Sequence, residues 1–225
     1  MATVTAEITE TNVRTESAKK TRVRKPKDIP GITRPMSYEE YLAGPEEMAR
    51  YDIIDGWKIY RKYGAKGLPN PTREHQRTQG NLYTEFRAFE KTVRVGQVIQ
   101  PPCDVLVRTT GAPRTRQPDL LFISSARLAQ NPPPDDPAPL SPAPELVVEI
   151  LSPSDTRRVQ TAKIADYISV GVHECWLVSM EAETVEVLSL TSGQAETIAV
   201  YGRGQTVAST AFLGLTVAVD TIFAE

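Results

Sequence analysis

The sequence predicts an α/β protein with a mixed central sheet flanked by helices and an added β-meander at its C-terminus. The apolar run ELVVEIL (145–151) is followed by a helical pattern and then by HECWLVS (173–179), a spacing typical of a right-handed parallel crossover. A second helical pattern, long and amphipathic, begins after Thr72. Residues 184–219 alternate between apolar and polar in short pieces, which indicates the meander.

Turn residues set the limits of the predicted strands. Asp55-Gly56 lies between two β-rich runs and predicts a tight hairpin that pairs residues 51–54 with 57–60. Pro118 opens a further strand, because proline is tolerated at the start of a strand but not in its middle.

Capping residues set the helix starts in the same way. Ser37 followed by Glu40 forms a capping box, and Thr72 caps the long helix. Ser154 or Asp155 is expected to cap the crossover helix.

Composition divides the chain near residue 35. Residues 1–35 hold eight Lys/Arg and four Asp/Glu without apolar periodicity, and are expected to form a disordered or loosely attached arm. The chain's net charge of −2 then leaves −6 for residues 36–225, which we expect to form one domain. The basic run over residues 19–27 could touch phosphates, but such runs are more often solvated, and we favour that interpretation.

The overall composition is that of a soluble protein. Apolar residues make up 40% of the chain and charged residues 24%. The two cysteines, Cys103 and Cys175, lack the close spacing of a zinc ribbon or redox motif. Neither the N-terminal residues nor any other stretch has the apolar run of a signal peptide or membrane span, so we expect a cytoplasmic protein without membrane contact.

Glu149 is the least expected residue of the sequence, since it is a carboxylate inside an apolar strand. Alternation places it on the face of Val147 and Leu151, so it must meet solvent or a buried partner. Asp119 directly follows Pro118, and a Pro-Asp pair taken alone is not diagnostic, because it is common in turns. Two acidic residues of one sheet can, however, converge on a hard divalent cation, and we expect Asp119 and Glu149 to be metal ligands.

Lys163 is predicted to reach Glu149 from the crossover helix. From Glu149 to Ser154 the extended chain covers about 16 Å. From Ser154 to Lys163 an antiparallel helix leads back over about 13 Å, so that Lys163 lies level with Glu149. An ammonium there could orient an attacking water or stabilise developing charge. Tyr167 shares this helix face and could hydrogen-bond in the pocket or pack against the sheet; we favour packing.

Two further residues are candidates. Asp52 lies in the hairpin on the face opposite Tyr51 and Ile53, and could complete the acidic ligand set of the metal or assist a second ion. His75, at the start of the long helix, could contact phosphate or water, although a surface histidine is about equally expected there.

The order of motifs along the chain resembles the Uma family of restriction endonucleases, within the PD-(D/E)XK nuclease superfamily. The resemblance covers roughly residues 36–223. The motifs are Y-D-x-I-D-G (51–56), E-H (74–75), Q-P-D-L (117–120), V-V-E-I-L-S-P-S (147–154), K-x-x-x-Y (163–167) and G-V-x-E-C-W-L-V (171–178).

The resemblance implies a restriction-endonuclease-like core in which two carboxylates and a lysine act with Mg²⁺. Asp119 and Glu149 match the carboxylates, but Leu151 stands at the usual lysine position, so the lysine has moved to Lys163 on the following helix. Asp52 replaces the family's usual glutamate, and His75 matches a family histidine near the site.

These features predict a Mg²⁺-dependent endonuclease, with Mn²⁺ able to substitute and DNA as substrate. RNA is the weaker substrate alternative. The alternative function is a binding or regulatory module that keeps the nuclease fold without useful turnover, an alternative motivated by the acidic charge of residues 36–225. Double-strand cutting would suit a two-fold homodimer, an expectation taken from the superfamily.

Overall fold

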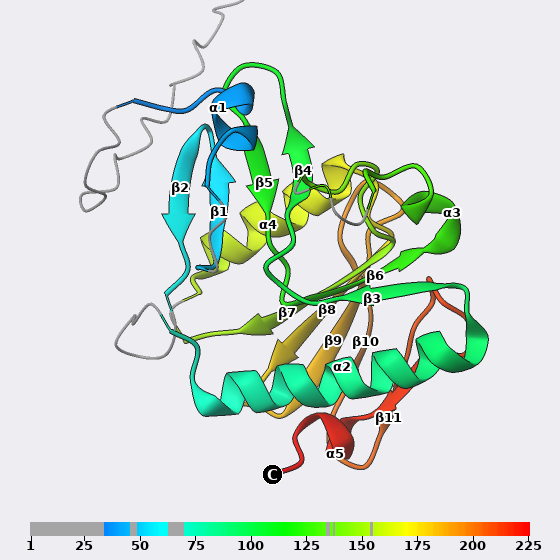
Figure 1. Ribbon diagram of the computed structural model, residues 1–225. Coiled ribbons are helices and arrows are strands. Elements are labelled where there is room, and N and C mark those ends of the chain that lie inside the picture. Colours follow the sequence, from blue (N-terminus) through cyan, green and yellow to red (C-terminus); the bar gives the residue numbers. More distant parts are fainter. Residues whose placement is uncertain (1–33, 46–48, 63–69, 134–135, 137, 154) are drawn as a thin grey trace, which may run out of the picture. The chain divides into compact units, whose positions relative to one another are not determined.

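A mixed six-stranded sheet forms the centre of the computed structural model, which describes residues 34–45, 49–62, 70–133, 136, 138–153 and 155–225 (Figure 1). Within these residues only β7 and β8 run parallel, and the other neighbours in the sheet are antiparallel. The strands in sheet order are β10 (Glu196–Tyr201), β9 (Thr184–Ser189), β8 (Glu174–Ser179), β7 (Leu146–Leu151), β6 (Leu120–Ser124) and β3 (Gly96–Ile99).

The predicted crossover is confirmed, because β7, the helix α4 (Arg157–Ser169) and β8 follow one another and the two strands are parallel. The predicted cap of α4 was wrong by one position. Thr156 is the N-cap, and its hydroxyl accepts a hydrogen bond from the amide of Val159 at 3.3 Å. Asp155 instead accepts from the amide of Ser152, while Ser154 lies outside the described residues.

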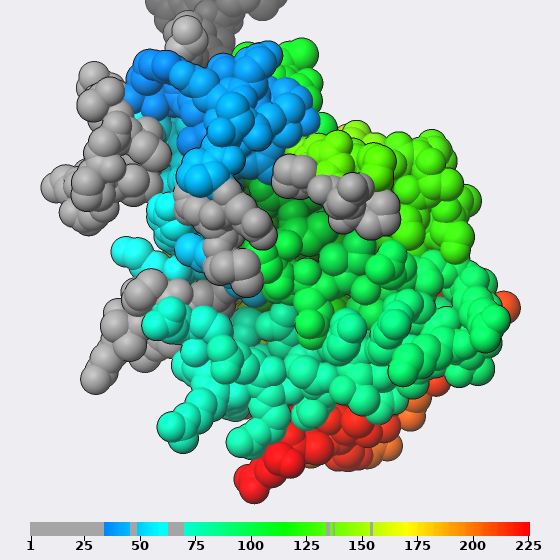
Figure 2. Space-filling view, viewed as in Figure 1, coloured from blue at the N-terminus to red at the C-terminus, as the bar shows by residue number. Residues whose placement is uncertain are grey.

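Two apolar layers cover the opposite faces of the sheet. The long helix α2 (Arg73–Val93) packs Leu82 and Phe86 against one face, which also receives Val148 from β7. Tyr167 of α4 packs against the other face, with Val147. Figure 2 shows α2 in front, with the C-terminal residues below it. The strict alternation along β7 therefore sends Glu149 towards α4, as the sequence predicted.

A hairpin and a second strand pair lie beside the main sheet. β1 (Tyr51–Ile54) and β2 (Trp57–Tyr60) pair in the predicted register, and the turn residues Asp55 and Gly56 have φ angles of 50° and 79°. Such positive φ values are what an Asp-Gly hairpin turn requires. β4 (Val105–Arg108) pairs with β5 (Arg114–Arg116), a strand that the sequence analysis missed.

The remaining elements are short. Helix α1 (Tyr38–Leu42) has the predicted capping box, and α3 (Ser125–Leu128) and α5 (Val219–Ile222) are single turns. None of the described helices is both long enough and apolar enough to cross a membrane.

The C-terminal meander is only partly as predicted. β9 and β10 extend the central sheet, whereas β11 (Thr206–Ala208) and β12 (Thr216–Ala218) pair with each other in a separate sheet. Val207 and Val217 turn inwards from this pair and join the core under α2. Residues Ile32–Glu225 form one compact unit. The expected arm over residues 1–35 falls almost wholly outside the described residues, so it stays a prediction.

Candidate active site

Glu149 accepts hydrogen bonds from two side chains of α4. The Nζ atom of Lys163 lies 2.8 Å from its Oε2 atom, and the hydroxyl of Tyr167 lies 2.5 Å from its Oε1 atom. Lys163 and Tyr167 are one helical turn apart, so both reach the same carboxylate from one face of the helix. The position expected for Lys163 from chain lengths is thus the one observed. For Tyr167 we favoured packing over a hydrogen bond in the pocket, and the structure shows both.

Asp119 lies directly before β6 and is held against β7 by the backbone. Its amide donates to the carbonyl of Val148 at 2.9 Å, and the amide of Ile150 donates to its Oδ2 atom at 2.8 Å. These bonds reach the residues on either side of Glu149. The side chain of Asp119 is fully buried and that of Glu149 is 5% exposed. Two adjacent strands therefore bring together two buried carboxylates.

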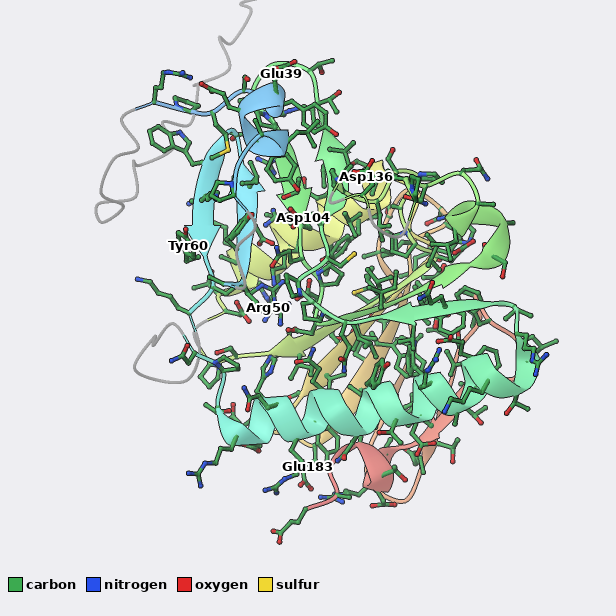
Figure 3. All side chains as sticks on the ribbon, viewed as in Figure 1. Glu39, Arg50, Tyr60, Asp104, Asp136 and Glu183 are labelled. Atoms are coloured by element: carbon green, nitrogen blue, oxygen red, sulfur yellow. The ribbon has the colours of Figure 1, made fainter. Side chains whose placement is uncertain are left out.

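Two arginines from the hairpin complete the cluster. Arg50 and Arg61 flank β1 and β2, and the amide of Arg61 donates to the carbonyl of Arg50. Nη1 of Arg50 lies 2.5 Å from Oδ1 of Asp119. Arg61 reaches both carboxylates, with Nη1 3.4 Å from Asp119 Oδ1 and Nη2 3.3 Å from Glu149 Oε2. In Figure 3, Arg50 lies between the hairpin and the N-terminal part of α2.

The electrostatics of this cluster follow from burial and pairing. Burial alone would raise the pKa of Asp119, but the guanidinium groups of Arg50 and Arg61 outweigh it and hold that pKa well below its usual range. Burial would lower the pKa of Arg61, but Glu149 and Asp119 more than offset this and raise it well above its ordinary value. Asp119 and Arg61 are consequently both charged at neutral pH.

His75 approaches Asp119 from the start of α2. Its Nε2 atom lies 3.4 Å from Asp119 Oδ1, and the side chain is buried. The helix places it there because the Thr72 hydroxyl accepts a hydrogen bond from the His75 amide at 3.1 Å. The structure thus favours a site histidine over a surface one. Beside it opens a hollow of about 440 Å³, lined among others by His75, Leu151 and Met180.

Asp52 does not join the two carboxylates. Its Oδ2 atom accepts from Arg116 at 3.0 Å and its Oδ1 atom from the amide of Gln117 at 3.0 Å. Burial works to raise the pKa of Asp52, but Arg61, Lys163 and Arg116 together lower it. Among the described residues no three acidic, histidine or cysteine side chains are grouped as a metal site would need. The expected set of three carboxylate ligands is therefore not formed.

The pair Asp119 and Glu149 nevertheless suits a hard cation. Both side chains offer oxygen ligands, which Mg²⁺ prefers, and both are held on rigid strands. The guanidinium of Arg61 contacts both carboxylates, so they lie close enough together to share one cationic partner. The donor set thus fits one divalent ion held by two carboxylates, with further ligands from water or substrate.

Sequence reasoning missed Arg50 and Arg61. A signal was present, because the predicted hairpin register places the two arginines opposite each other at its open end, just beyond the paired residues 51 and 60. Their target was not predictable, since it depends on how the hairpin packs beside β5. The amide of Ile53 donates to the Thr115 hydroxyl at 3.3 Å, which is one of the bonds that fix this packing.

Fold and site together define an α/β protein of the restriction-endonuclease-like class. Among solved structures, the chain is similar to a crystal structure of a putative nuclease belonging to DUF820 from Anabaena variabilis ATCC 29413. The two share 21% identity with a TM-score of 0.64, over 84% of this chain and 98% of the other. At this identity the likeness shows the fold.

The family follows from the sequence match. Residues 38–220 match the Uma2 family, whose description is "Putative restriction endonuclease". The chain belongs to this family, which confirms the resemblance found from the ordered motifs. No curated protein matches the sequence.

Proposed function

We propose that this protein is a Mg²⁺-dependent endonuclease that hydrolyses DNA phosphodiester bonds. The observation that carries the proposal is the pair of buried carboxylates, Asp119 and Glu149, with the ammonium of Lys163 in direct contact. Membership of a restriction-endonuclease family supports it. Mn²⁺ is expected to substitute, because it shares the preference of Mg²⁺ for oxygen ligands.

Each residue has a role that its position supports. Asp119 and Glu149 would hold the ion, which supplies polarisation of a phosphoryl oxygen and a water of lowered pKa. Lys163 would orient the attacking water and stabilise the charge that develops on the phosphate. Tyr167 fixes the orientation of Glu149 through its hydrogen bond. His75, buried beside Asp119 and lining the hollow, would contact phosphate or water.

Cleavage of supercoiled plasmid by purified protein tests the proposal. We expect cutting with Mg²⁺ or Mn²⁺, none with EDTA, and a loss of about 100-fold or more in folded Glu149→Ala and Lys163→Ala variants. Lys91→Ala is the control, because this exposed lysine lies in the last turn of α2, at the end of the helix away from His75. Full activity in either site variant would overturn the residue assignment, and a parallel digest of RNA would decide the substrate class.

The second candidate is a binding or regulatory module with the same fold and no useful turnover. It is favoured by the contacts of the site, where both carboxylates are already paired with cationic side chains. Such a protein would cut neither nucleic acid under any divalent metal and would fail to bind Mn²⁺. Mn²⁺ binding that is lost in Asp119→Asn would argue against it.

A further inference from the structure

Arg61 is the cationic group that spans both carboxylates of the site. Its two terminal nitrogens contact Asp119 and Glu149 at 3.4 and 3.3 Å. Of the two carboxylates, Arg50 contacts Asp119 and Lys163 contacts Glu149. A divalent ion held by the same two oxygens would have to share this space with the guanidinium, and two cations repel each other at such short range.

We propose that Arg61 gives up its place between Asp119 and Glu149 to the divalent ion and transfers its guanidinium to a phosphate of the nucleic acid. This inference rests on the proposed function. Its consequence is that metal and nucleic acid bind cooperatively, since each favours the same displaced position of Arg61. The coupling must be reciprocal, because binding free energies are linked.

The contacts of Arg61 are those of a group that can be displaced. They are longer than the 2.5 Å contact of Arg50 with Asp119 and the 2.8 Å contact of Lys163 with Glu149. The Nε atoms of Arg50 and Arg61 are both buried without a hydrogen-bond partner in the described residues, so this unfavourable feature does not distinguish the two arginines. Nη2 of Arg61 also donates a hydrogen bond to the carbonyl of Gln117. Of the three cations, Arg61 is therefore the one with the longest contacts to the carboxylates.

The charge balance of the site indicates that the displaced guanidinium of Arg61 moves towards a phosphate. Three cationic side chains, Arg50, Arg61 and Lys163, already face two carboxylates. A divalent ion added to them leaves an excess of positive charge that a phosphodiester can balance. A guanidinium suits this partner, because its planar donors match two phosphate oxygens at once.

The test measures Mn²⁺ affinity by calorimetry on the full chain, without nucleic acid. For Arg61→Gln we expect tighter Mn²⁺ binding by about tenfold, although the same variant should cut DNA more slowly. Lys91→Gln removes the same charge from an exposed residue in the last turn of α2, at the end of the helix away from His75, and should change Mn²⁺ affinity by less than about twofold. A merely structural role for Arg61 would weaken Mn²⁺ binding instead.

Cooperativity is measured by adding a non-cleavable phosphorothioate DNA. The DNA should strengthen Mn²⁺ binding by the wild type more than by Arg61→Gln. If Arg61→Gln fails to fold, Arg61→Lys keeps the charge but is too compact to span both carboxylates, and it should also bind Mn²⁺ more tightly than the wild type.

The two proposals fail in different ways. Equal or weaker Mn²⁺ binding by the Arg61 variants, with clear binding by the wild type, would overturn the displacement of Arg61 alone. Absence of Mn²⁺ binding from the wild type and every variant, with or without DNA, would overturn the proposed function together with it.

Discussion

Two aspartates, the fully buried Asp119 and the partly buried Asp104, differ in ionisation because their partners differ. Burial raises the pKa of both, but arginines contact Asp119 and bring its pKa well below the usual range. Asp104 instead receives a hydrogen bond from the neutral hydroxyl of Tyr41, and burial raises its pKa to about 6. A neutral donor offsets the loss of hydration less than a guanidinium does.

Asp104 is consequently expected to make stability fall with rising pH. In the unfolded chain it ionises near the ordinary aspartate pKa of 3.8, while in the folded protein it keeps its proton up to about pH 6. The folded state thus binds more protons across this window, and stability is lost as pH rises through it, by at most about 3 kcal/mol. In Asp104→Asn, which keeps an acceptor for Tyr41, urea unfolding should lose this part of the pH dependence between 4 and 6.5. An unchanged profile would contradict the assignment.

The site residues that could be predicted from the sequence were those that interrupt a regular apolar or polar pattern. Glu149 stood out because a carboxylate interrupts an apolar strand, and its proximity to Lys163 followed from the lengths of strand and helix. Arg50 and Arg61 break no pattern, because arginines beside a hairpin are ordinary surface residues. Asp52 was placed correctly in its strand, but its partner Arg116 comes from β5, which was not predicted.

The start of α2 links local helix chemistry to the site. Thr72→Ala removes the acceptor for the His75 amide and should cost about 1 kcal/mol of unfolding free energy. Thr84→Ala in the exposed middle of the same helix is the matched control and should be neutral or slightly stabilising, since alanine is the better helix former. Urea midpoints measure both. An equal loss in the two variants would mean that the cap does not stabilise the start of α2.

Elements with strong local signals were predicted and elements fixed by distant contacts were not. The hairpin follows from Asp55-Gly56, and α2 from Thr72 and its apolar spacing. β5 has only three residues, two of them arginines, so no alternation reveals it. The separation of β11 and β12 from the central sheet depends on packing under α2, which local sequence does not contain.

Charge at the scale of the whole molecule predicts how nucleic acid binds. Residues 36–225 carry a net charge of −6, so general attraction to phosphate is weak and a bound metal should contribute strongly. We expect DNA affinity to fall by about fivefold or more when EDTA replaces Ca²⁺, an ion that usually supports binding without cutting. Fluorescence anisotropy at fixed ionic strength measures this. Equal affinity in both buffers would show that the metal and DNA sites are not linked.

Leu151 and Lys163 line one small hollow next to Glu149, although they lie on a strand and on a helix. A lysine at either position could therefore extend its ammonium to the same point in space. Spacing along the chain is for this reason a poor guide to where the cation of such a site lies, and its three-dimensional position beside the carboxylate is the feature to compare between related chains.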